Sequence, residues 1–159
     1  NGYSLARRVL ETEMQLPLDQ EVAELGHTLA DELLTPTRIY ARAVADLIAA
    51  LGSDLHALSH ITGGGVPGNL GRVLASGTVA RIRFDHPRPA VFDLVARGGP
   101  VSEPEMLRTF NLGIGLVAVV AAGRTETAIE ALGAAGERAW ALGTVAEQAS
   151  GQTPRVELL

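Results

Sequence analysis

Apolar residues recur along the chain at two different spacings, which predict its helices and strands. The clearest helical stripe is formed by Val44, Leu47, Ile48 and Leu51, and Gly52 is expected to end that helix. Similar spacing or start signals predict helices over these segments: 3–13, 28–34, 39–51, 69–74, 91–96, 102–109 and 125–132.

Strands are predicted where apolar residues alternate with polar ones or form short continuous runs. Residues 78–84 alternate as in a half-buried strand. Residues 112–121, within the longest apolar run 112–122, are expected to be the best strand of the chain. The predicted strands are 55–61, 78–84, 112–121, 140–145 and, at an edge, 156–158.

Several residues are expected to mark helix ends. Ser4 is interpreted as the N-cap of the first helix, and Ser102 with Glu105 as a capping box. Gly133 is expected to terminate the helix over 125–132. Because helices and strands interleave irregularly, the sequence predicts an α+β fold in which helices pack against a mixed β-sheet, as one domain over 1–159.

The composition of the chain argues against several classes of function. The 159 residues suffice for one domain of ordinary size, and no charge-free apolar run reaches the ~18 residues of a membrane span. There is no cysteine, which excludes disulfides and thiolate metal sites, and all 13 basic residues are arginine, which excludes a catalytic lysine in this chain. The net charge of −5 without a basic block argues against nucleic-acid binding. The four histidines are scattered, so no metal site is predicted.

The segment 60–70 is the most informative for function. Gly63, Gly64 and Gly65 follow a predicted strand, and glycine lets the backbone adopt positive φ and approach a ligand. Successive amides of Thr62–Gly65 leading into a helix could hold a phosphate. The alternative is a tight strand-to-helix turn without a ligand, and His60 at its start could equally be a proton carrier or a packed histidine.

Two further segments carry candidate binding residues. Thr37 and Arg38 lie in a loop rich in hydrogen-bond donors, where Arg38 could hold a phosphate or carboxylate bidentately; a proline turn with a solvated arginine is the alternative. Asn111 precedes Gly113 and Gly115, whose spacing by two implies close approach of a backbone or ligand to one strand face. Helix packing could also explain these glycines, and Asn111 could simply cap a helix.

Together, four ordered motifs resemble the C-terminal half of the aminoimidazole ribonucleotide synthetase family. They are Asn-Gly-Tyr-Ser-Leu at 1–5, Leu-Leu-Thr-Pro-Thr-Arg-Ile-Tyr at 33–40, His-Ile-Thr-Gly-Gly-Gly at 60–65 continuing to Leu74, and Glu-Met-Leu-Arg-Thr-Phe-Asn-Leu-Gly-Ile-Gly-Leu at 105–116. Val66, Gly68 and Ala75 stand where the family commonly has leucine, glutamate and proline, which leaves local loop shape open. The resemblance covers nearly the whole chain.

The resemblance implies an ATP-dependent cyclo-ligase of purine biosynthesis that converts formylglycinamidine ribonucleotide to aminoimidazole ribonucleotide in the cytoplasm. It also implies that this chain, which starts with Asn1 rather than methionine, is an inactive fragment. ATP and Mg²⁺ would bind mainly to the missing N-terminal domain, and the full-length enzyme would be a homodimer. The residues expected at the substrate and phosphate site are Asn1, Thr37, Arg38, Thr62, Gly63, Gly64, Gly65, Asn69 and Asn111, with His60 as the candidate proton carrier.

Two other functions stay open at this point. One is a sister enzyme of the same superfamily that phosphorylates a different acceptor. The other is a non-catalytic anion-binding module that reuses the fold.

Overall fold

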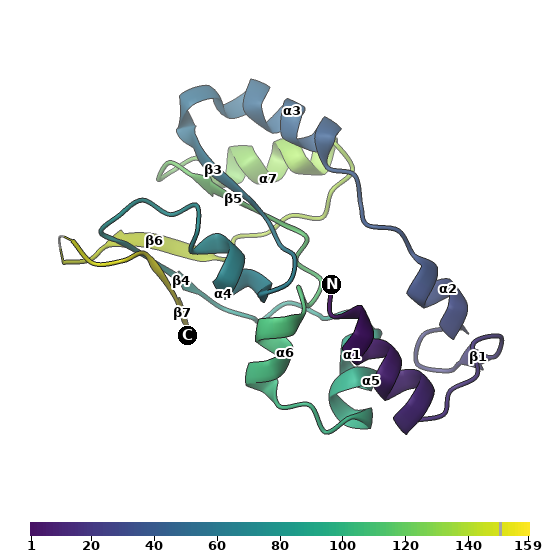
Figure 1. Cartoon of the computed structure of the whole chain (residues 1–159). Helices are drawn as coiled ribbons and strands as arrows, with labels where there is room; N and C mark the ends of the chain where they lie inside the picture. Colours follow the sequence, from purple (N-terminus) through teal and green to yellow (C-terminus); the bar gives the residue numbers. More distant parts are fainter. Residues whose placement is uncertain (150) are drawn as a thin grey trace. The chain divides into compact units, whose positions relative to one another are not determined.

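The computed structural model describes residues 1–149 and 151–159, which fold into two compact units (Figure 1). The first unit comprises Asn1–Thr37, Thr62–Gly68 and His86–Ile114, and the second comprises Arg38–Ile61, Asn69–Asp85 and Gly115–Leu159. Each unit therefore gathers segments that are distant in sequence.

Short helices dominate the first unit. Its elements are α1 (Tyr3–Arg7), the π-helical turn η1 (Arg8–Glu13), the paired strands β1 (Glu21–Val22) and β2 (His27–Thr28), α2 (Leu29–Leu34), α5 (Ala90–Gly98) and α6 (Glu103–Thr109). η1 packs closely on the end of α5, because a methyl group added at Gly98 would collide with the side chains of Val9 and Met14. The buried apolar residues of this unit include Val9, Leu10, Leu29, Leu94, Val95, Met106, Phe110 and Leu112.

The second unit holds the larger sheets. β3 (Leu55–His60) pairs antiparallel with β5 (Leu116–Val120). β4 (Thr78–Ile82) lies between β6 (Gly143–Glu147), which runs antiparallel to it, and β7 (Arg155–Leu158), which runs parallel. The predicted α+β class with a mixed sheet is confirmed, although in the described part of the chain the strands are divided among three small sheets.

Two helices cover the β3–β5 pair. α3 (Ala41–Leu51) and α7 (Thr125–Ala134) lie side by side (Figure 1), and η2 (Gly52–Asp54) connects α3 to β3. Gly52 has a φ of 53°, which confirms it as the residue that ends α3. The core under these helices consists of Leu47, Leu51 and Ala128, packed against Leu55, Leu58, Ala118, Val120, Ala131 and Leu132.

Three predicted boundaries were wrong. The helix expected over 69–74 is α4 (Gly65–Leu70), which starts already at the third glycine of the turn. α7 continues past Gly133, and the left-handed residue beyond it is Gly136, with a φ of 85°. The strand expected over 140–145 begins only at Gly143. Element ends depend on local hydrogen bonds that apolar spacing does not report.

The strand predicted over 112–121 is also shorter than expected, since β5 begins at Leu116. Leu112 and Gly113 have φ values of 51° and 92°, which are incompatible with a strand. The N–H of Gly113 donates to Asn111 Oδ1 at 3.0 Å, and the N–H of Ile114 donates to the Asn111 carbonyl at 2.9 Å. Gly113 and Gly115 therefore do not alternate on one strand face, because a turn built on Asn111 contains the first of them.

Two predicted helix caps were wrong, although one of them marks the start of its helix correctly. Gly2, not Ser4, occupies the N-cap of α1, with a φ of 74°. Ser102 is at the N-cap of α6, but its side chain makes no capping hydrogen bond, and the side chain of Glu105 contacts Arg108 and Thr109 instead. The predicted capping box is therefore wrong, although the predicted start of α6 is confirmed.

The contrast between two caps gives a testable prediction. Thr28 Oγ1 accepts a hydrogen bond from the N–H of Asp31 at 3.1 Å at the start of α2. We expect Thr28→Ala to lower the free energy of unfolding by about 1 kcal/mol. Ser102→Ala, which removes no capping bond, should change it by less than about 0.5 kcal/mol. Urea unfolding of the 159-residue chain measures both values, and equal losses would contradict the assignment of the caps.

Candidate functional site

The glycine turn connects β3 to α4. Gly64 and Gly65 have φ values of 100° and 59°, in the left-handed region that favours glycine. The N–H of Gly65 donates to the carbonyl of Thr62 at 3.1 Å, which closes the turn. Gly63 is exposed, Thr62 and Gly64 are half-buried, and Gly65 is buried. The turn is thus open to solvent at its centre and packed at its end.

The three glycines have different roles. A methyl group at Gly65 would collide with the carbonyl oxygens of Leu107 and Phe110, so this glycine is required by packing against the end of α6. At Gly63 the nearest atom to an added Cβ is Asn1 Oδ1, at 3.8 Å. The packing explanation therefore holds for Gly65, whereas a Cβ added at Gly63 would make only an ordinary van der Waals contact with the side chain of Asn1.

The amide of Gly64 is the best candidate for a ligand contact in this turn. Within residues 1–149 and 151–159, the structure gives its N–H no hydrogen-bond acceptor. Since this residue is only half-buried, a ligand could reach the N–H without unfolding the turn. Positive-φ glycines next to further amides are typical of anion-binding turns.

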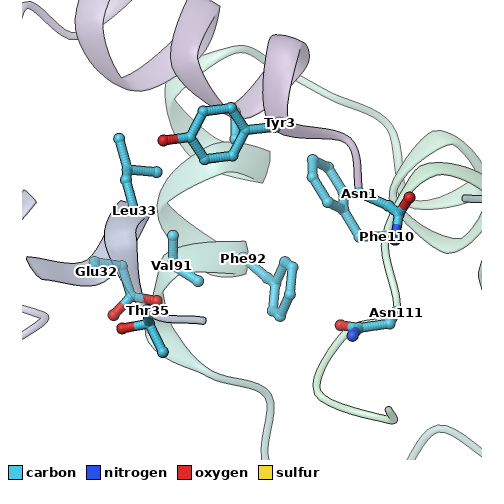
Figure 2. Close-up of a pocket in the computed structure, with 10 residues that line it drawn as sticks. Asn1, Tyr3, Glu32, Leu33, Thr35, Val91, Phe92, Phe110 and Asn111 are labelled. Atoms are coloured by element: carbon cyan, nitrogen blue, oxygen red, sulfur yellow. The ribbon is translucent and has the colours of Figure 1, made fainter. Parts of the chain in front are cut away.

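A hollow of about 220 Å³ lies in the first unit (Figure 2). Its lining is Asn1, Tyr3, Ala6, Glu32, Leu33, Thr35, Val91, Phe92, Phe110 and Asn111. Phe92 and Phe110 form an aromatic pair with ring centroids 5.5 Å apart. Figure 2 shows Asn1 and Asn111 on the side of Phe110, with Glu32 and Thr35 opposite them. We call this space the asparagine hollow; it brings together two residues that the sequence placed in the site.

Asn111 contributes to the hollow through a constrained side chain. Its Oδ1 accepts the N–H of Gly113, so the carboxamide is held in one orientation by the turn that follows α6. Figure 2 shows this side chain extending toward Phe92. A primary amide whose oxygen is occupied by the backbone offers its two N–H bonds as donors. Asn111 therefore shapes the turn after α6 rather than capping that helix, and it also presents a polar group to the hollow.

Arg38 lies in the second unit, just before α3. Its Nη1 donates to Glu137 Oε2 at 2.5 Å, and the Arg38 side chain is 58% exposed. This hydrogen bond, together with the charge of Glu137, raises the pKa of the Arg38 guanidinium. The arginine is thus paired with a carboxylate, while more than half of its side chain stays exposed to solvent.

Tyr40 forms a small cluster with two neighbours in the second unit. Its ring meets that of His60 edge-on, with centroids 5.9 Å apart. Its hydroxyl lies over Gly115, where any added Cβ would collide with it. Burial raises the pKa of the Tyr40 hydroxyl, and the charge of Glu137 adds to this. Gly115 is therefore required by close approach of a tyrosine, and the predicted need for a glycine there has a structural cause.

The remaining predicted site residues are placed as follows. Thr37 is exposed in the loop before α3. Asn69 is only 6% exposed, and its Oδ1 lies 3.5 Å from Arg72 Nη1, so it sits in a structural position within α4. The first unit contains Asn1, Thr37, Thr62, Gly63, Gly64, Gly65 and Asn111, and the second contains Arg38, His60 and Asn69.

The sequence analysis missed the aromatic lining of the hollow and the partner of Arg38. Phe92 gave no signal, because isolated aromatic residues are typical of any core. Tyr3 and Phe110 lie within the quoted motifs but were not named as site residues. Glu137 follows Gly136 directly after a helix, and such a glycine at a helix end fixes the residue behind it. Reading that pattern as a cap would have singled out Glu137.

Among the described residues, no three His, Cys, Asp or Glu side chains are grouped so that they could hold a metal ion. In residues 1–149 and 151–159, no helix has the length and apolar character needed to cross a membrane.

Comparison with known proteins relates the chain to one protein family. The family model for AIR synthase related protein, C-terminal domain, matches residues 1–153. The phosphoribosylformylglycinamidine cyclo-ligase of Sorangium cellulosum (strain So ce56) is 60% identical over 146 residues, which are 91% of this chain and 42% of that protein. The enzyme of the same name from Anaeromyxobacter sp. (strain Fw109-5) is 52% identical over 147 residues, or 91% of this chain and 42% of that protein.

The chain spans about two fifths of the length of these relatives, whereas the family model covers almost all of the chain. The chain therefore belongs to the family of AIR synthase related proteins and corresponds to their C-terminal domain.

Proposed function

We propose that this chain is the C-terminal part of an ATP-dependent cyclo-ligase that converts formylglycinamidine ribonucleotide to aminoimidazole ribonucleotide. The proposal is supported by relatives that are 50–60% identical and carry the name of this enzyme. It is also supported by the asparagine hollow and the accessible glycine turn, which offer polar groups suited to a phosphorylated amide substrate.

The reaction proposed for the complete protein has two steps. The amide oxygen of the substrate takes the γ-phosphoryl group of ATP, which forms an iminophosphate and releases ADP. An internal nitrogen then attacks that carbon, the five-membered ring closes, and phosphate leaves. Phosphoryl transfer of this kind depends mainly on positioning and on neutralising charge. The residues of this chain are therefore proposed to bind and orient, with His60 as the candidate proton carrier.

The observation that carries the proposal is the Gly64 amide, which lacks an acceptor within the described chain and lies in a positive-φ turn open to solvent. Hydrogen bonds from backbone N–H groups to a charged oxygen are shorter and stronger than neutral ones. Asn1, whose Oδ1 lies near Gly63, adds a carboxamide that could donate to the same anion. We propose that this turn holds a phosphate group of the substrate or of ATP.

The asparagine hollow is proposed to take the polar, acyclic part of the substrate. Asn1 and Asn111 line the hollow. Their carboxamides both donate and accept hydrogen bonds, and so do the amide and amidine groups of the substrate. Val91, Phe92 and Phe110 add an apolar floor that would limit access of water.

ATP and Mg²⁺ are proposed to bind mainly to an N-terminal domain, as the family resemblance implies. Among the described residues of this chain, no group of three His, Asp or Glu side chains is placed to hold a metal ion. Formylglycinamidine ribonucleotide, ATP and the N-terminal domain are thus the proposed partners, in a cytoplasmic homodimer.

The function is tested by comparing the 159-residue chain with the complete protein that contains it. We expect the chain alone to show no cyclisation, and the complete protein to release ADP only when formylglycinamidine ribonucleotide is present. ADP release driven by a different acceptor would indicate a sister enzyme. Cyclisation by the chain alone, or a complete protein without any ATP-dependent activity, would contradict the proposal.

A further inference from the structure

We propose that Glu137 is a positioning residue that holds the Arg38 guanidinium by one edge and so presents its other edge to a phosphate group. This inference rests on the proposed function, in which Arg38 contacts an anionic substrate. It assigns a role to a carboxylate that the sequence analysis did not name as a site residue, at the end of a helix 99 residues from Arg38 in the chain.

The fold places Glu137 through the C-terminal cap of α7. Gly136 is left-handed, with a φ of 85°. The N–H of Gly136 donates to the carbonyl of Gly133 at 3.0 Å, and the N–H of Glu137 donates to the carbonyl of Leu132 at 2.9 Å. These two bonds and the left-handed glycine form a Schellman motif, which fixes the backbone of the residue after the glycine. The carboxylate of Glu137 therefore starts from a defined position.

The two partners differ in how firmly they are held. The Glu137 side chain is 18% exposed, whereas that of Arg38 is 58% exposed. The more buried carboxylate is thus the fixed partner, and the arginine is the group that it orients. A guanidinium carries five N–H bonds in a rigid, planar fork. The hydrogen bond to Glu137 uses Nη1 alone, so within the described chain Nε and Nη2 of Arg38 have no protein acceptor.

Packing around Tyr40 holds the segment that carries Arg38. Tyr40 lies two residues after Arg38, its hydroxyl covers Gly115, and its ring meets His60 edge-on. Arg38 is therefore anchored at its backbone by Tyr40 and at its guanidinium by Glu137. An arginine held at both ends loses less conformational freedom when it binds an anion than a freely rotating one does.

A competing idea makes the opposite prediction. If Glu137 merely occupied the anion site, a phosphate would have to displace it, and removing the carboxylate would strengthen phosphate binding. If Glu137 positions Arg38, its removal weakens phosphate binding. The two ideas therefore differ in the sign of one measurable effect.

The test is a titration of the 159-residue chain with inorganic phosphate at constant ionic strength. The arginine Nε–H signals are followed by NMR, and the signal of Arg38 is identified from Arg38→Lys. We expect Glu137→Ala to raise the Kd for phosphate at this signal about two- to fivefold, the range that an exposed ion pair can supply. The guanidinium of Arg38 should also rotate faster in this variant, which a purely structural role for Glu137 would not require. Glu137→Gln, which keeps an acceptor oxygen, should lie closer to the wild-type chain.

The matched control is Glu157→Ala. Glu157 forms ion pairs in the same unit with Arg81, at 3.0 Å, and with Arg155, at 2.8 Å, and its removal changes the net charge by the same amount. This variant should leave the phosphate titration of Arg38 unchanged. A circular dichroism spectrum of each variant verifies that it is folded.

Each outcome decides between the ideas. Equal or tighter phosphate binding by a folded Glu137→Ala chain would overturn the positioning role, while the anion contact of Arg38 would stand. If the Arg38 signal does not respond to phosphate even in the wild-type chain, the anion contact itself fails and the inference falls with it. The cyclo-ligase function is tested separately by the ADP-release comparison, so the two failures are distinguishable.

Discussion

Replacement of Gly65 by alanine is expected to lower the free energy of unfolding by about 3 kcal/mol or more. The φ of Gly65 is 59°, and an added Cβ would meet the backbone carbonyl oxygens of Leu107 and Phe110. Backbone atoms cannot rotate away as a side chain can, so the turn or α6 must shift. Urea unfolding of the 159-residue chain measures the loss, and the same shift should weaken phosphate binding at Gly64.

Gly68→Ala is the matched control for this prediction. Gly68 lies in the same helix, and an added Cβ there would meet no atom within 4 Å. Because alanine favours helix more than glycine does, this variant should be neutral or more stable by about 0.4–1 kcal/mol. Similar losses for both variants would show that Gly65 is not held against α6 as described.

The second large effect is expected at Asn111. Aspartate at this position keeps an oxygen that can accept the N–H of Gly113, so the turn should survive. It removes the donor group from the asparagine hollow and adds a negative charge next to an anionic substrate. We expect kcat/KM of the complete protein to fall at least about 100-fold, as for the loss of one well-placed donor in other active sites. The stability of the chain should change by less than about 1 kcal/mol.

Asn111→Ala separates the two roles of this residue. It removes both the donor and the acceptor for Gly113, which supports the positive φ of Leu112. We therefore expect it to reduce stability by about 1–2 kcal/mol as well as activity. Gln20→Glu, an exposed position outside the hollow, controls for added charge. Full activity of Asn111→Asp would remove Asn111 from the site.

The regular elements could be predicted where one face of an element is buried. α3 is an example, because its apolar stripe at Leu47 and Leu51 faces the core and Gly52 ends it. The run after Asn111 could not be predicted in the same way. It is apolar enough for a strand, but the Asn111 side chain takes the Gly113 amide and turns the chain before Leu116. A local side-chain contact therefore overrides the hydrophobic pattern, as is common for asparagine.

The site was only partly predictable for a related reason. Single residues such as Asn1 and Asn111 could be named from motifs, and the structure brings both to one hollow. The ion pair of Arg38 with Glu137 joins positions 99 residues apart, and no periodicity reports a contact of that kind. Likewise, the requirement for glycine at position 115 arises from Tyr40, which lies far earlier in the sequence.

The proposed function depends most directly on whether the turn after β3 binds phosphate. An amide NMR titration of the 159-residue chain with inorganic phosphate tests this, with chloride at equal ionic strength as the reference. We expect saturable shifts that are largest at Gly63 and Gly64, and that are reduced in Asn111→Asp. Saturable shifts elsewhere while both glycine signals stay in place would contradict the phosphate-binding role of this turn.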